Sequence, residues 1–149
     1  MSVYQQEIQA SATTIYQLLS DVGGWRIWNR RVAFSALDGD TQTGARGVLY
    51  LRRLAWLRWS LLIDEVIENQ KISMHSQCLG VHVHFTFEIQ ADQRGERCLL
   101  VGRIRSESLL GRLTSSRLLP LWRGFLGNAL QGVQYAAEAV QLASTTQNE

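Results

Sequence analysis

Hydrophobic and polar residues alternate along most of the chain, in short segments separated by turn residues. The clearest segment is residues 81–89, where Val81, Val83, Phe85, Phe87 and Ile89 share one face and polar residues occupy the other. Alternation with a period of two predicts a strand with one buried face and one wet face. Similar segments predict six further strands of an antiparallel sheet, at 3–9, 32–36, 48–54, 59–67, 72–76 and 99–107.

Two short helices are expected after the first strand. Ser11 is a suitable N-cap for a helix over residues 12–20, because its hydroxyl can accept a hydrogen bond from the first turn. A second, single-turn helix is expected over residues 24–29, where Trp25 and Trp28 lie one i,i+3 step apart.

The chain ends in a long amphipathic pattern. Apolar residues recur at helical spacing from Leu118 to Val140. Pro120 is then either the first helical residue or a kink after a preceding turn. Strands in sequence with helices at both ends predict an α+β fold, with a curved antiparallel sheet of about seven strands wrapped around the long helix. Such a sheet leaves a hollow between itself and the helix.

Several local motifs resemble the START-like superfamily, also called SRPBCC or polyketide cyclase/dehydrase, whose fold is the helix-grip. The resemblance extends from about Val3 to Val140. It rests on five segments: Glu7–Ala12 as the junction from strand to helix, Leu18–Asp21 and Trp25–Asn29 as the helix pair, Glu107–Gly111 at the end of the last strand, and Asn128–Leu130 in the last helix. Two positions depart from the family pattern, Arg30 in place of proline and Leu109 in place of an aromatic residue.

The resemblance implies a single START-like domain over residues 1–149, with an ordered core of about 3–142. It also implies a small hydrophobic or amphipathic ligand, of lipid, polyketide or aromatic type, in the cavity between sheet and helix. Members include carriers, receptors, aromatase/cyclases and chaperone activators. Two alternatives therefore stay open, an aromatase/cyclase-type enzyme and a chaperone-activator-like interaction module. No cofactor is expected, and the oligomeric state expected is a monomer or weak homodimer.

Large apolar side chains are the candidates for lining this cavity, although each is more often plain core. They are Trp25, Trp28, Tyr50, Trp59, Met74, Phe85, Phe87, Phe125 and Ala129. Trp56 and Trp122 are expected at its rims.

Three charged residues end the last predicted strand. Arg103, Arg105 and Glu107 continue the face that Leu99 and Val101 begin. If this face points inward, the three side chains form a polar cavity mouth that orients an anionic or phenolic ligand group. An enzyme would then use Glu107 or Tyr50 as general acid–base, with Arg103 at the oxyanion. If the strand twists outward, they form a surface row of ion pairs.

The three histidines suggest a metal site, but their position argues against one. His82 and His84 share the face opposite Val83 and Phe85, and a hairpin brings His75 across from one of them. That face is expected to be wet, without the supporting groups that a metal site needs. No metal site is predicted, and a solvated cross-strand patch is preferred.

Composition excludes several other classes. The chain has 149 residues, 46% hydrophobic and 19% charged, which is ordinary for a globular domain. No segment approaches the 18 or so apolar residues of a membrane span, and the first ten residues do not resemble a signal peptide. Cys78 and Cys98 are expected to be free thiols, because the strand between them separates them widely. A cytoplasmic location is therefore expected.

A net charge of +2 is too small for a nucleic-acid interface. The segment Arg52–Trp59 is the nearest approach to one, with three arginines and two tryptophans. Arginine stems that cover exposed indole rings are the preferred interpretation, so no nucleic acid is expected as a partner.

Overall fold

The computed structural model describes residues 2–108 and 112–147, with side chains described for residues 2–107 and 119–145. Seven antiparallel strands form one sheet in the order β1-β7-β6-β5-β4-β3-β2. The strands are β1 (Ser2–Ile8), β2 (Val32–Leu37), β3 (Arg46–Leu51), β4 (Trp59–Ile67), β5 (Lys71–Cys78), β6 (Val81–Ala91) and β7 (Cys98–Ser108).

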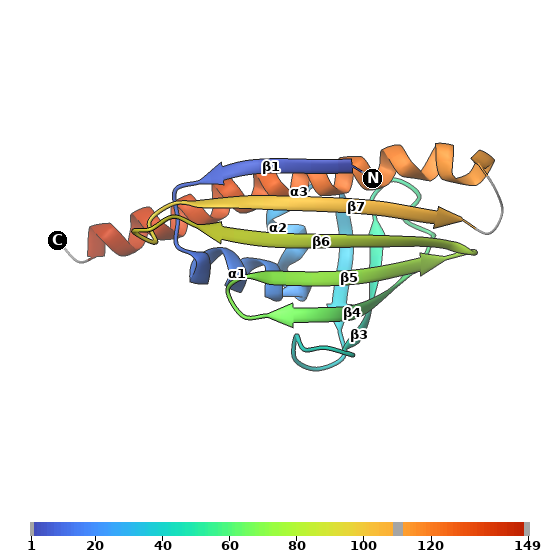
Figure 1. Ribbon diagram of the computed structural model, residues 1–149. Coiled ribbons are helices and arrows are strands. Elements are labelled where there is room, and N and C mark those ends of the chain that lie inside the picture. The colour runs from blue at the N-terminus through green and yellow to red at the C-terminus, as the bar shows by residue number, and fades with distance from the viewer. Residues whose placement is uncertain (1, 109–111, 148–149) are drawn as a thin grey trace.

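The helices lie on one side of this sheet (Figure 1). Helix α1 (Ala12–Ser20), the 3-10 turn η1 (Val22–Gly24) and α2 (Trp25–Trp28) connect β1 to β2, and α3 (Arg112–Gln147) ends the described chain. Helix α3 packs against β1, β7 and α1. The predicted α+β helix-grip arrangement is confirmed. In the described residues, no helix is both long enough and apolar enough to cross a membrane.

Local contacts follow the sequence signals at the first helix. The hydroxyl of Ser11 accepts a hydrogen bond from the backbone N–H of Thr14 at 3.3 Å, which satisfies a donor in the first turn of α1. The helix spans the predicted residues, and Ile15 and Leu19 are fully buried on its inner face.

Helix α3 begins earlier than the apolar pattern predicts. It starts at Arg112, so Pro120 lies inside the helix rather than at its first residue or after a separate turn. A proline removes one backbone hydrogen bond, which a helix of 36 residues can lose without ending.

Two close approaches hold α2 and α3 in place. The side-chain amide of Asn29, which is fully buried, donates to the carbonyl of Phe125 at 3.1 Å, and its oxygen accepts from the N–H of Arg31 at 3.0 Å. Gly132 of α3 lies so close to α2 that a Cβ there would overlap the carbonyl oxygen of Trp28. These contacts explain why the α2 segment lies beside the helix that covers the sheet.

Pairing with β6 determines which side of β7 faces the core. The buried Phe85 and Phe87 stand opposite Ile104 and Gly102. At Gly102 an added Cβ would come within 2.9 Å of side chains on α3, so the missing side chain lets the helix approach the sheet.

Candidate functional site

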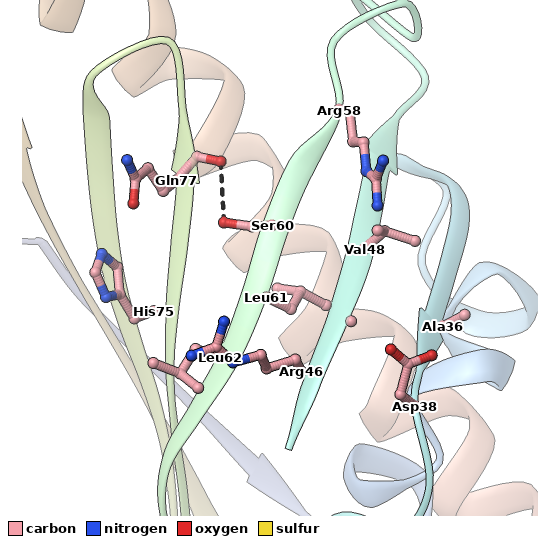
Figure 2. A pocket seen from close by; sticks show the side chains of 11 residues that line it. Ala36, Asp38, Arg46, Val48, Arg58, Ser60, Leu61, Leu62, His75 and Gln77 are labelled. Carbon is pink, nitrogen blue, oxygen red and sulfur yellow. Dashed lines mark hydrogen bonds between the residues drawn. The ribbon is translucent and has the colours of Figure 1, made fainter. Parts of the chain in front are cut away.

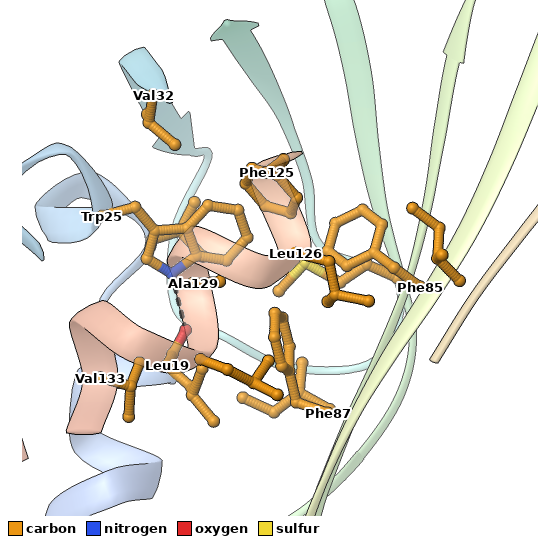
Figure 3. Packing of buried hydrophobic residues seen from close by; sticks show 14 of the residues in the cluster. Leu19, Trp25, Val32, Phe85, Phe87, Phe125, Leu126, Ala129 and Val133 are labelled. Atoms are coloured by element: carbon orange, nitrogen blue, oxygen red, sulfur yellow. Dashed lines mark hydrogen bonds between the residues drawn. The ribbon is translucent and has the colours of Figure 1, made fainter. Parts of the chain in front are cut away.

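The space between the sheet and α3 is filled by a cluster of aromatic side chains. Trp25, Phe85 and Phe125 are at most 1% exposed and come from α2, β6 and α3 (Figure 3). Their rings touch in tilted and edge-on arrangements, with centroids 5.5 to 6.4 Å apart. Aromatic pairs prefer such geometry because ring edges are positive and ring faces negative.

Most of the predicted cavity residues belong to this cluster. Seven of the nine apolar candidates are fully or almost fully buried in one continuous core: Trp25, Trp59, Met74, Phe85, Phe87, Phe125 and Ala129. Trp28 is half-buried and packs at the edge of the core, where it also lines a surface groove between α2 and α3. The sheet and helix therefore bring these positions together, as the alternation and helical spacing predicted.

Trp122 is the main interior residue that the sequence analysis misplaced. It was expected at a rim, but it is completely buried, whereas Trp56 is 74% exposed as expected. Its ring lies edge-on to Trp59 at 5.0 Å and close to Phe85 at 5.6 Å. The i,i+3 spacing from Trp122 to Phe125 was the available signal, since both positions fall on the inner stripe of α3.

Three polar atoms in this core have no hydrogen-bond partner among the described residues. They are the indole nitrogens of Trp59 and Trp122 and the hydroxyl of Ser76. By contrast, the indole of Trp25 donates to the carbonyl of Leu19 at 3.0 Å. Buried donors in folded proteins are normally satisfied, so three exceptions in one core require an explanation.

These three groups, called the interior donors below, gather at one end of the core. The rings of Trp59 and Trp122 are in contact. Leu61 of β4 pairs with Ser76 of β5, so Ser76 lies diagonally from Trp59 on the same sheet face. Trp59 is therefore adjacent to both other members of the group, to Trp122 by ring contact and to Ser76 across the strands.

The charged triplet of β7 does not face this core. Arg103, Arg105 and Glu107 lie on the outer face, with side chains 38%, 55% and 61% exposed. Arg103 pairs with Glu88 at 2.7 Å, and Arg105 lies 3.6 Å from Glu107. The inward-facing interpretation is wrong, and the surface row of ion pairs is correct.

The error arose from a run of adjacent apolar residues. Leu99, Leu100 and Val101 are all apolar, so alternation alone does not decide which of them face inward. Leu100 belongs to the core, while Val101 is buried on the outer face between its strand neighbours. Pairing with the buried Phe85 and Phe87 of β6 places Ile104 and Gly102 on the inner face. Arg103 and Arg105 therefore lie on the outer face.

Tyr50 is also on the outer face, contrary to the cavity prediction. The neighbouring Leu49 and Leu51 are fully buried in the core, so Tyr50 between them points away from it. Its ring lies 6.3 Å from that of Phe34. A register shift between Val32 and Phe34 turns Phe34 outward, which the simple alternation of β2 did not anticipate. The acid–base arrangement expected of Glu107, Tyr50 and Arg103 therefore has no place in the interior.

The histidines form the cross-strand patch that was predicted. His75 pairs with His84 across β5 and β6, and their rings stack at 4.3 Å. The Nε2 of His75 and the Nδ1 of His82 are 2.9 Å apart and form a hydrogen bond, in which either ring nitrogen can be the donor. Burial and the neighbouring imidazole of His84 lower the pKa of His75. Within the described residues, no group of three or more side chains is arranged to hold a metal ion.

Both cysteines are free thiols, as predicted. Cys78 pairs with Val81 at one end of β6, and Cys98 pairs with Ala91 at the other. Burial raises the pKa of each thiol.

Comparison with known proteins identifies the fold. No protein-family profile and no curated protein matches the sequence. Among solved structures, a START superfamily protein from Mycobacterium smegmatis superposes with a TM-score of 0.75, at 16% identity over 93% of this chain and 97% of that chain.

Two enzymes have similar structures. Truncated norcoclaurine synthase from Thalictrum flavum has a TM-score of 0.68, at 14% identity over 89% of each chain. The ZhuI aromatase/cyclase from Streptomyces sp. R1128 has a TM-score of 0.69, at 15% identity over 92% of each chain. At these identities the similarity concerns the fold, which in this chain is the START-like helix-grip.

Proposed function

Because the chain has the START-like helix-grip fold, we propose that it binds a small, flat, amphipathic ligand between the sheet and α3. Proteins of this fold typically hold hydrophobic ligands in that position. The observation that carries the proposal is the group of interior donors, the two indole N–H groups of Trp59 and Trp122 and the hydroxyl of Ser76.

The interior donors indicate what the ligand carries. An indole N–H can only donate, so its partner must be a hydrogen-bond acceptor. Each unsatisfied buried donor costs about 1–3 kcal/mol, which an acceptor on the ligand would offset. A neutral carbonyl or phenol oxygen fits this position better than a carboxylate, because the surrounding side chains are apolar and a buried charge is expensive.

The surrounding side chains indicate the rest of the ligand. Trp59, Trp122 and Phe85 present ring faces and edges at contact distance from one another. A flat aromatic or polyketide-like body can replace such ring–ring contacts with contacts of similar geometry. We infer that binding parts these rings and inserts the ligand body among them, with its oxygen toward the interior donors.

The test uses two probes of nearly equal shape, 2-acetonaphthone and 2-ethylnaphthalene. Only the first has a carbonyl oxygen. By isothermal titration calorimetry, the ketone should bind about 5- to 10-fold more tightly, the effect of about one hydrogen bond. This preference should disappear in the double variant Trp59→Phe/Trp122→Phe, which keeps aromatic rings but loses both N–H groups.

Trp56→Phe is the matched control, because Trp56 is exposed and lies outside the core. It should leave both affinities unchanged. Equal binding of the two probes by the unmodified protein would contradict the role of the interior donors. Failure of both probes to bind would contradict the interior site itself.

A further inference from the structure

We propose a second binding site, on the opposite face of the sheet, for a small organic anion such as a phosphate monoester or a carboxylate. A pocket of about 640 Å³ lies there, across β2, β3, β4 and β5. Its volume is in the range of small-molecule sites. The site is independent of the interior one, because its charged groups belong to the outer face.

Strand pairing builds the pocket from two neighbouring cross-strand rows. Arg46 of β3 pairs with Leu62 of β4, which pairs with His75 of β5. The next row contains Val48, Ser60 and Gln77. Because every second residue of a strand shares a face, all six side chains stand on the outer side of the sheet.

The charges of the pocket favour an anion. Figure 2 shows Arg46 extending from β3 toward Leu62, while Arg58, the residue before β4, points toward Val48. No carboxylate among the described residues forms an ion pair with either guanidinium. Two arginines and one carboxylate, that of Asp38, line the pocket, so its fixed charges leave a positive excess.

The pocket is lined by both polar and apolar side chains. The hydroxyl of Ser60 donates to the backbone carbonyl of Gln77 at 3.2 Å, so it is already engaged. Arginine binds phosphate and carboxylate groups through paired N–H donors, which suits Arg46 and Arg58 to the charged end of a ligand. Ala36, Val48 and Leu62 offer apolar surface for its organic body. This combination fits an organic anion better than an inorganic one.

Asp38 is the one acidic residue among those that line the pocket. It lies on the β2 side, away from the guanidinium of Arg46 in Figure 2. This carboxylate would repel a bound anion, whereas the arginines would attract it. Neutralising Asp38 and neutralising an arginine should therefore change the affinity for an anion in opposite directions.

The experiment measures the affinity of phenyl phosphate by isothermal titration calorimetry at low salt. The unmodified protein should bind it with a dissociation constant at or below about 1 mM, and benzyl alcohol, which lacks the charge, should not bind. Benzoate is a parallel probe that separates a carboxylate ligand from a phosphate ligand. Inorganic phosphate should bind more weakly than phenyl phosphate, because it lacks the organic body.

Substitutions then locate the site. Arg46→Gln and Arg58→Gln should each weaken phenyl phosphate binding about 5- to 10-fold, and Asp38→Asn should strengthen it. Arg94→Gln is the matched control, since Arg94 is an exposed arginine in the β6–β7 turn, outside the pocket. None of these changes should alter the binding of 2-acetonaphthone, so failure of this site is distinguishable from failure of the interior site.

Two results would overturn the proposal. One is the absence of binding by phenyl phosphate and benzoate at concentrations up to about 10 mM, which leaves no useful affinity. The other is binding that Arg94→Gln weakens as much as Arg46→Gln does, because that would indicate diffuse attraction to a basic surface rather than a site.

Discussion

The two faces of the sheet differ in what stabilises their side chains. On the inner face of β6, Val83, Phe85 and Phe87 are at most 1% exposed and pack against helices. On its outer face, His82 and His84 are half-buried and meet other polar groups across the strands. The same strand therefore has one face stabilised by apolar burial and one by cross-strand polar contacts and water.

The two proposed sites differ in ligand chemistry for the same reason. A polar group without a partner is costly on the inner face, so the interior donors are significant there. On the outer face, water can satisfy polar groups, and Arg46 and Arg58 differ from a surface arginine such as Arg94 in that they line a pocket. We therefore expect neutral, flat ligands inside and charged ones outside.

The largest effect is expected when two positions of β6 on opposite faces of the sheet are substituted. Phe85→Ala should destabilise the protein by about 3–5 kcal/mol, because it removes a fully buried ring that contacts four aromatic neighbours, Trp25, Phe87, Trp122 and Phe125. Gln90→Ala, at an exposed outer position, should change stability by no more than about 0.5 kcal/mol. Urea unfolding followed by circular dichroism measures both, and similar losses would refute the assignment of faces.

A smaller effect is expected at the charged end of β7. Glu107→Ala should cost between 0 and about 1 kcal/mol, since its carboxylate and the Arg105 guanidinium are both largely exposed. Ile104→Ala, three residues away on the inner face, should cost about 2–5 kcal/mol. Thermal and urea unfolding of the two variants check this. A loss above about 3 kcal/mol for Glu107→Ala would return Glu107 to the interior.

The smallest effect concerns the pH dependence of stability. The pKa of His75 is lowered below its ordinary value of 6.5, by burial first and by His84 next. The folded protein then binds fewer protons than the unfolded chain just below pH 6.5, so His75 makes stability fall as the pH decreases through that window. Other charges that act on its pKa are those of His82, Asp64 and Glu107.

His75→Gln isolates this contribution. Between about pH 7.5 and 5, the unmodified protein should lose more stability than the variant, because the variant has no imidazole to protonate at this position. Urea unfolding at several pH values measures the difference. Parallel curves for the two proteins would show that His75 titrates alike in the folded and unfolded states.

The strands differ in how clearly their residue pattern shows which face is buried. The alternation of β6, with β-branched and aromatic residues against polar ones, was enough to identify its inner face. In β3 and β7 adjacent apolar residues are compatible with either face being buried, and the predicted inward positions of Tyr50 and Arg103 are wrong. A run of adjacent apolar residues does not show which of them face inward. Hydrogen-bonded pairing with a neighbouring strand does, because paired residues share a face of the sheet.

The candidate site was predicted in the same uneven way. Residues such as Phe85 and Phe125 follow from period and helix spacing, because each lies on a face that must be buried. The interior donors could not be predicted, since whether Trp59, Ser76 and Trp122 find partners depends on what three separate elements bring near them. The outer pocket likewise requires the register of β3 against β4 and β5.

The order of the elements, the cap at Ser11, the inner face of β6 and the resemblance to the helix-grip fold could all be predicted from the amino-acid sequence. These depend on periodicity and local hydrogen bonding, which act over a few residues. The inner and outer faces of β3 and β7, the burial of Trp122, and the placement of Arg46 and His75 on either side of Leu62 in one cross-strand row required the three-dimensional structure. Those features arise from strand register and helix packing, which join residues far apart along the chain and leave no local pattern in it.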